Sequence, residues 1–213
     1  MDMRPDLLSL VLLWASVTQA EVLVQPDFDA KKFSGLWHVV SMVSDCKVFL
    51  KNKDHLLMST VDVNATVKGD LEVHIELPRR DGCKRMDVQY LKVGSEGHFK
   101  VPALGYLDVR VADTDYSSFA VIYIYKELEG ALSTMVQLYS RTQDATLQAL
   151  QAFENFYPTL GLQADMVVRP PGSDVCSLGQ WSTLMPLESS PSPTQVGHMV
   201  DSEAANLTTQ EAQ

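Results

Sequence analysis

The sequence has few basic residues, and this shortage limits the partners that the protein can have. Of 213 residues only 17 are Lys or Arg, against 27 Asp or Glu, which gives a formal net charge of −10 at pH 7. Phosphate backbones and anionic lipid surfaces would repel such a chain, and no basic stripe is present, so nucleic-acid binding is excluded. Disorder throughout is excluded as well, because 46% of the residues are hydrophobic.

Long apolar runs are missing too, except for one at the start of the chain. Residues 1–20 contain an apolar run over 7–17 and small residues that lead to Ala20. A run of this length is typical of a secretory signal peptide, whereas a membrane-spanning helix needs about 20 apolar residues. We therefore expect cleavage after Ala20, a secreted extracellular protein and no membrane insertion. The alternative is an uncleaved anchor, since Asp2 and Asp6 weaken the basic start that signal peptides prefer.

Cysteine is scarce, with Cys46, Cys83 and Cys176 as the only three. In an oxidising secretory compartment two of them should pair and leave one over, and spacing alone leaves each of the three pairings open. Asn64 and Asn206 each begin an Asn-x-Thr acceptor pattern, which predicts a glycoprotein.

Motifs of the common enzyme and metalloprotein classes are also absent from the sequence. The five His residues show no paired spacing suited to a metal. No Gly-rich phosphate loop, Gly-x-Ser-x-Gly elbow or His-Glu-x-x-His pattern occurs. We therefore expect no metal and no cofactor.

What the sequence does contain is a hydrophobic period of two. Leu71, Val73, Ile75 and Leu77 alternate with charged or polar residues, as the half-buried strands of a sheet do. Turn signals rich in Gly and Asp separate runs of this kind. Strands are expected at residues 36–43, 56–67, 71–77, 86–93, 98–101, 106–112, 118–125 and 132–139. Eight strands joined mainly by short turns predict an all-β protein, an antiparallel up-and-down barrel without exposed edges.

A single good helix follows the strands. Thr146 can cap a segment in which Leu147, Leu150, Phe153 and Tyr157 share one face, and Pro158 lies past its end. Residues 119–125 are apolar on both faces, so we expect the helix to pack outside the barrel over this strand.

The chain is therefore expected to have three parts. After the signal peptide of residues 1–20, residues 21–176 form the barrel domain. Residues 177–213 are rich in Ser, Thr and Pro and have no hydrophobic period, which is typical of a disordered tail.

Three short motifs stand on the expected strands in a characteristic order. Gly35-x-Trp37 opens the first strand, Thr114-Asp115-Tyr116 lies between the sixth and seventh, and Arg141 follows the eighth. Together they resemble the three signature regions of the lipocalins, in the calycin superfamily, and the resemblance covers residues 28–176. It implies an eight-stranded calyx that is closed at one end, holds a small apolar ligand and carries its C-terminal helix on the outer wall.

The resemblance also implies roles for individual residues. Trp37 can plug the tapered end of the barrel, Gly35 lets the backbone pass close by, and Arg141 can stack on the indole, so these residues are expected to be structural. The family's single disulfide would join Cys83 to Cys176. Cys46 would then be the unpaired thiol, in a long loop over the open mouth.

One lipocalin branch, the prostaglandin D synthases, suggests an enzymatic alternative. That branch uses a cysteine on the second strand, and the matching position here is Ser59, which lacks a nucleophilic thiolate. We therefore expect no enzyme. Cys46, beside Lys47, remains open as an inert or capped thiol, an intermolecular disulfide or, least favoured, a catalytic group.

The expected function is extracellular binding and transport of a small hydrophobic molecule in the barrel. No Lys or Arg falls clearly on the inward faces, so neutral ligands are favoured slightly, with Arg85 as a candidate counter-ion at the mouth. Fatty acids, retinoids, steroids and odorants remain open, and a protein or cell-surface receptor bound through the mouth loops is a further alternative. The predicted pocket residues are Val39, Ser41, Leu71, Val73, Ile75, Leu107, Val109, Val121 and Tyr123.

Overall fold

The computed structural model describes residues 24–128 and 130–177. The predicted signal peptide, Asn206 and all but the first residue of the predicted tail lie outside these residues. Among the described residues, no helix is long and apolar enough to cross a membrane.

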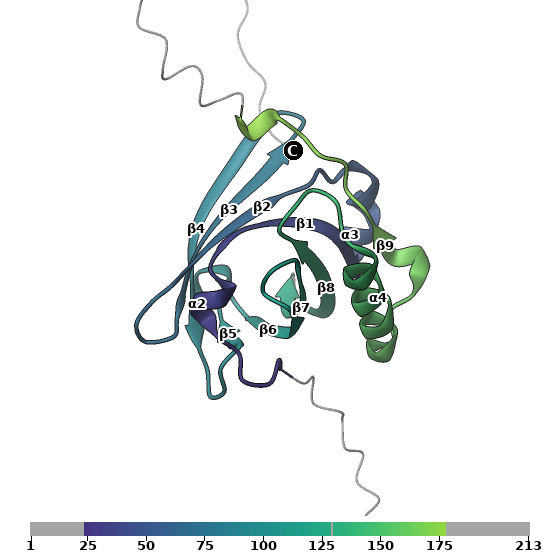
Figure 1. Cartoon of the computed structure of the whole chain (residues 1–213). Helices are drawn as coiled ribbons and strands as arrows, with labels where there is room; N and C mark the ends of the chain where they lie inside the picture. The colour runs from purple at the N-terminus through teal and green to yellow at the C-terminus, as the bar shows by residue number, and fades with distance from the viewer. Residues whose placement is uncertain (1–23, 129, 178–213) are drawn as a thin grey trace, which may run out of the picture.

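Eight antiparallel strands form a closed barrel, which confirms the predicted fold class (Figure 1). Each strand pairs with the next along the chain, and pairing of the first with the second and the eighth closes the ring. The strands are β1 (Gly35–Ser44), β2 (Thr60–Ala65), β3 (Leu71–Arg79), β4 (Gly82–Lys92), β5 (His98–Lys100), β6 (Leu107–Thr114), β7 (Phe119–Leu128) and β8 (Ala131–Ser140). A two-residue strand, β9 (Val167–Val168), pairs with β1 beyond the point where β2 leaves it.

The long helix α4 (Leu147–Phe156) packs on the outside of the barrel, as predicted (Figure 1). The Thr146 hydroxyl caps it by accepting a hydrogen bond from the Ala149 backbone amide at 3.1 Å. Phe153 and Tyr157 are buried against residues of β7 and β8, whereas Leu147, expected on the same face, is 80% exposed. Ala149 is the residue of the first turn that is buried instead.

Two short helices at the ends of the barrel were not predicted. Helix α2 (Ala30–Phe33) precedes β1 and inserts Phe33 into the base of the barrel. Helix α3 (Lys47–Asn52) and a 3-10 turn at Lys53–His55 lie in the segment that was expected to be an irregular loop. As a result β2 begins at Thr60, four residues later than the sequence pattern indicates.

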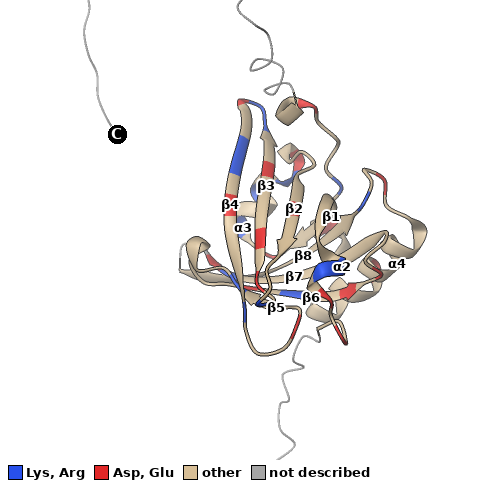
Figure 2. Ribbon diagram, turned by 60° about the vertical axis from the view of Figure 1, so that its left-hand side comes forward, with Lys and Arg blue, Asp and Glu red and all other residues tan. Residues whose placement is uncertain are grey.

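The buried residues form two separate cores. One fills the barrel interior and the other lies between α4 and the outer faces of β1, β7 and β8. In the view of Figure 2, acidic and basic residues are interspersed over the strands and turns. The interior core is the part of the fold that positions the candidate site.

Candidate functional site

The inner wall of the barrel is almost entirely apolar. Val73, Val88 and Val109 come from three different strands and are buried in one cluster with the base of the barrel. The predicted pocket residues Val39, Leu71, Val73, Ile75, Leu107 and Val109 all belong to this cluster or pack against it. Their contact with a ligand stays a prediction.

A β-bulge in β1 shows that one predicted pocket residue is wrong. Val39 pairs with Tyr139 of β8, but the next pair is Ser41 with Leu138, so Val40 is an extra residue. An extra residue inverts the alternation of faces beyond it. Ser41 therefore lies on the outer side with Leu138, and Met42 faces the interior in its place.

The two pocket residues predicted on β7 are also wrong. Val121 is buried in the outer core, in the same cluster as Phe153 of α4, and Tyr123 pairs with Val136 of that core. Ala120 and Ile122 face the interior instead. The sequence pattern could not decide between the two faces, because this strand is apolar on both.

Trp37 and Arg141 close the base of the barrel. The indole is fully buried, its Nε1 donates to the Phe33 carbonyl at 2.8 Å, and the Arg141 Cζ lies 3.5 Å from the ring centroid. The guanidinium also donates to backbone carbonyls of Leu36 and Ser34, each at 3.0 Å. A Cβ on Gly35 would lie 3.2 Å from the Arg141 Nη1, so glycine gives the guanidinium room.

The motif Thr114-Asp115-Tyr116 forms the turn next to this plug. The Asp115 carboxylate accepts hydrogen bonds from the backbone amides of Ser118 and Phe119 at 2.8 and 2.9 Å. Tyr116 has a φ of 63°, and its carbonyl accepts from the Arg141 Nε at 3.1 Å. These contacts hold the base of the barrel together and leave no group of the motif directed at a ligand.

Two phenols line the narrow lower part of the interior. The cavity there is about 10 Å³, close to the smallest space that holds one water molecule. Tyr90 and Tyr139 both line it. Burial raises the pKa of Tyr90 to about 12, and burial together with the nearby Tyr90 raises the pKa of Tyr139 well above its ordinary value. Both phenols are therefore neutral hydrogen-bond donors at physiological pH.

Flexible side chains line the wall above the phenols. Met42 and Met135 are buried in the interior cluster, and Gln137 donates from its Nε2 to both sulfur atoms, at 3.6 and 3.4 Å. A methionine wall adapts to irregular ligands at low cost. Gln137 lies among these apolar groups. The sequence analysis missed it, because it did not predict which residues of β8 face the interior.

Helix α3 covers the mouth of the barrel. Phe49 is buried in the interior cluster, and Leu50 and Leu56 pack against it, so this segment inserts apolar side chains between the rims of the strands. Cys46 immediately precedes the helix and is 6% exposed. It is therefore an interior group at the mouth, not a thiol on an open loop.

A lysine also faces the interior near the mouth. Lys126 of β7 pairs with Leu107 and with Ser133, and it alternates with the inward residues Ile122 and Ile124. It is half-buried. The expectation that no basic residue points inward is therefore wrong. The sequence pattern did not reveal this lysine, because the prediction placed Val121 and Tyr123 on the inner face of β7 and therefore Lys126 on the outer face.

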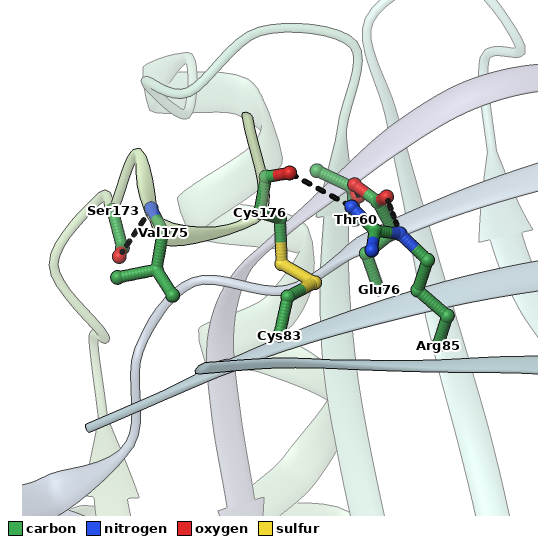
Figure 3. The surroundings of a disulfide bond; sticks show 7 residues. All are labelled: Thr60, Glu76, Cys83, Arg85, Ser173, Val175 and Cys176. Carbon is green, nitrogen blue, oxygen red and sulfur yellow. Dashed lines mark hydrogen bonds and ion pairs between the residues drawn. A yellow bond between two sulfur atoms is a disulfide. The ribbon is translucent and has the colours of Figure 1, made fainter. Parts of the chain in front are cut away.

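Arg85, the predicted counter-ion at the mouth, is engaged elsewhere (Figure 3). Its Nε donates to the Glu76 carboxylate and its Nη2 to the Cys176 carbonyl, both at 2.8 Å. The disulfide between Cys83 and Cys176 lies beside this pair and ties the C-terminal segment to β4. Arg85 thus helps to hold the C-terminal segment and is not free to bind a ligand.

Ser59, the residue that the resemblance predicts at the position of the synthase cysteine, is buried just before β2. Its carbonyl accepts a hydrogen bond from the Val39 amide at 2.9 Å. A hydroxyl at this place provides no low-pKa nucleophile.

Asn64, the glycosylation candidate within the described residues, lies exposed on β2. Its occupancy by a glycan stays a prediction.

Known proteins resemble this chain over most of its described length. The model of the Lipocalin / cytosolic fatty-acid binding protein family matches residues 34–174. Lipocalin-15 of Homo sapiens is 70% identical over 168 residues, which cover 79% of this chain and 91% of that protein. Prostaglandin-H2 D-isomerase of Canis lupus familiaris is 32% identical over 163 residues, which cover 74% of this chain and 85% of that protein.

A solved structure shares the architecture. It is described as "The Siderocalin Ex-FABP functions through dual ligand specificities", and it aligns with a TM-score of 0.63 and 26% identity over 67% of this chain and 95% of that one. The closed barrel, the plug of Trp37 and Arg141, and the match over residues 34–174 agree with one another. The chain belongs to the Lipocalin / cytosolic fatty-acid binding protein family.

Proposed function

We propose that this chain is a secreted carrier that binds one small hydrophobic molecule inside the barrel. The observation that carries the proposal is the barrel interior, whose lining is apolar apart from two phenols, Tyr90 and Tyr139. A phenol in an apolar pocket can hydrogen-bond a polar atom of a ligand, so this lining favours an apolar ligand with a polar atom. The family and the apolar wall support the same function.

Binding requires the interior to open. A cavity of about 10 Å³ cannot hold a lipid. Burial of apolar ligand surface contributes about 25 cal/mol per Å² to the free energy of binding, so side chains of the interior must move for a ligand to be buried there. Met42, Met135 and Phe49 are the groups best placed to move, because methionine is flexible and Phe49 comes from a short helix at the mouth.

Within this function, Lys126 favours a ligand with a carboxylate. It lies at the mouth end of β7, paired with Leu107 and Ser133, while the wall below it is apolar. An amphipathic molecule with its anionic end at Lys126 and its chain directed toward Tyr90 would satisfy both regions. Fatty acids therefore fit better than the neutral steroids and odorants, and retinoids fit where they carry an acid group.

Replacing Lys126 by Met tests the carrier and its counter-ion together. The probe is cis-parinaric acid, a fluorescent polyene fatty acid, compared with its methyl ester. We expect the acid to bind two- to fivefold more weakly to Lys126→Met, since a partly exposed ion pair contributes about 0.5 to 1 kcal/mol. The ester should bind both proteins equally.

The matched control is Lys100→Met, because Lys100 is an exposed lysine on β5. Equal loss in both variants would contradict a specific counter-ion and indicate a general charge effect. Failure of the unaltered protein to bind either acid or ester would contradict the carrier itself.

Truncation of Phe49 should change the speed of ligand exchange. Phe49→Ala removes the largest apolar group that α3 inserts into the mouth. A loss of about 1 to 2 kcal/mol of apolar contact corresponds to 5- to 30-fold faster dissociation, measured by stopped-flow fluorescence with cis-parinaric acid. Val48→Ala, at the exposed neighbouring residue, is the control, and equal rates in all three proteins would show that α3 does not restrict the exit.

Secretion follows from the same proposal. The disulfide between Cys83 and Cys176 is expected of an oxidising compartment. Isomerase activity is the less favoured reading despite the isomerase relative, because Ser59 replaces the nucleophile in the resemblance.

A further inference from the structure

We infer that Gln137 is a specificity-determining residue, which favours fatty acids with a hydroxyl or keto oxygen near the middle of the chain. The inference deepens the proposed function and rests on it, because it takes the carboxylate of the acid to lie at Lys126. Three properties of the Gln137 amide carry it, namely its direction, its accessibility and its hydrogen bonds.

The Gln137 side chain faces the interior of the barrel. Gln137 pairs with Ile122 of β7 and with Met42 of β1, and both partners belong to the interior cluster. Its neighbours in sequence, Val136 and Leu138, belong to the outer core instead. Side chains of directly paired residues lie on the same face of a sheet, so Gln137 points inward.

The amide is accessible to a molecule in the barrel. Gln137 is half-buried, whereas the inward residues before and after it on β8, Met135 and Tyr139, are 8% and 5% exposed. Since Gln137 points inward, its exposed part opens onto the interior. A ligand that enters the barrel to this depth would cover it.

The hydrogen bonds of the amide favour a ligand oxygen at this place. The Gln137 Nε2 donates to the sulfur atoms of Met42 and Met135 at 3.6 and 3.4 Å. Thioether sulfur is a weak acceptor, and an amide in apolar surroundings costs free energy unless it is well hydrogen-bonded. A hydroxyl or keto oxygen is a stronger acceptor for Nε2, and the Oε1 of the same amide can accept from a hydroxyl.

The strand register sets the position of that oxygen along the ligand. The inward residues of β7 and β8 form cross-strand pairs in four successive tiers from the mouth to the base, namely Lys126 with Ser133, Ile124 with Met135, Ile122 with Gln137, and Ala120 with Tyr139. Successive tiers are about 7 Å apart along the strand, so Gln137 lies about 13 Å below Lys126. A zigzag of about ten carbon–carbon bonds, each about 1.5 Å long, spans this distance. The preferred oxygen is therefore on a carbon about ten to twelve positions from the carboxylate.

Three saturated acids of equal chain length test the inference by displacement of cis-parinaric acid. They are stearic acid, 12-hydroxystearic acid, with its hydroxyl at the expected place, and 2-hydroxystearic acid, with its hydroxyl beside the carboxylate. We expect 12-hydroxystearic acid to bind at least about threefold more tightly than either of the others, which is the size of one net hydrogen bond between neutral groups. Equal affinities for all three acids would overturn the inference.

Gln137→Met tests whether the amide provides this preference, because methionine keeps the unbranched shape. We expect 12-hydroxystearic acid to bind this variant at least about fivefold more weakly, since its buried hydroxyl loses a partner. Stearic acid should keep its affinity, which also shows that the variant is folded, and Gln137→Leu repeats the measurement with a different apolar shape. Gln89→Met, at an exposed glutamine of β4, is the matched control and should change none of the affinities. A preference for 12-hydroxystearic acid that survives in both Gln137 variants would overturn the role of Gln137.

The same measurements separate this inference from the carrier function. A protein that binds all three acids equally contradicts the inference and leaves the carrier function intact, whereas a protein that binds none of them contradicts both. Lys126→Met should weaken the three acids by the same factor. A change in their order of affinity would show that Lys126, and not Gln137, recognises the hydroxyl.

Discussion

Replacement of Trp37 by Ala is expected to destabilise the protein by about 3 to 5 kcal/mol, as buried Trp and Phe truncations do. The indole is fully buried, contacts the Phe33 ring at a centroid distance of 5.3 Å and carries the Arg141 guanidinium on its face. Its removal leaves a cavity at the base of the barrel and deprives Arg141 of the surface on which it stacks. Single domains have only about 5 to 15 kcal/mol of stability, so the variant should be marginally folded.

Urea unfolding followed by circular dichroism measures this change. Leu36→Ala is the matched control, because Leu36 precedes Trp37 on β1 and is 49% exposed. The control should change stability by about 0.5 kcal/mol or less. A Trp37→Ala protein of unchanged stability that had lost affinity for cis-parinaric acid would show that the indole is a ligand contact and not a plug.

A double-mutant cycle isolates the contact between the indole and the guanidinium. Arg141→Lys keeps a positive charge but loses the planar group that stacks and donates to several carbonyls. The coupling free energy between this change and Trp37→Ala should be about 0.5 to 2 kcal/mol. Additive effects would mean that Arg141 acts through its carbonyl contacts alone.

The base of the barrel was predictable because three motifs, in their order along the chain, resemble the signature regions of the lipocalins. The resemblance assigned Gly35, Trp37 and Arg141 to one plug, and the structure places the Arg141 guanidinium over the Trp37 ring and next to Gly35. The barrel was predictable for a different reason, since its strands alternate with a period of two and are separated by turn residues. The helix over β7 followed from a strand that is apolar on both faces.

The inward faces could not be predicted fully, and the reasons are physical. The bulge at Val40 in β1 inverts the alternation, and no residue type in that stretch signals it. On β7 both faces bury apolar side chains, so Val121 and Ile122 are equivalent in sequence and differ only in what packs against them. That single ambiguity also concealed the inward direction of Lys126.

The mouth was the least predictable part. Helix α3 has six residues, too few to show a helical period, and no side chain caps its start. Its formation depends on burial of Phe49 in the barrel, a tertiary effect that local sequence does not reveal. The position of Cys46 follows from that helix, which is why the thiol was expected on an open loop.

Removal of the disulfide is expected to have an effect as large as the loss of Trp37. Cys83 and Cys176 are 93 residues apart, and a cross-link of that span restricts the unfolded chain by an amount equivalent to about 4 to 5 kcal/mol in the chain-entropy model. We expect Cys83→Ala with Cys176→Ala to lose much of this, in a Cys46→Ser background that prevents thiol exchange. Urea unfolding gives the free energy and its slope with denaturant.

The slope separates an effect on the unfolded state from an effect on the folded one. The segment before Cys176 has other attachments, because Val167 and Val168 pair with β1 and the Pro171 carbonyl accepts from the Met58 amide at 2.8 Å. The folded barrel should therefore remain intact without the bond. An unfolded chain that is free to expand exposes more surface, so the slope should rise as stability falls. A stability loss below about 1 kcal/mol with an unchanged slope would show that the disulfide restricts the unfolded chain little. It would also show that two other contacts hold the C-terminal segment by themselves. These are the pairing of β9 with β1 and the hydrogen bond from Arg85 to the Cys176 carbonyl.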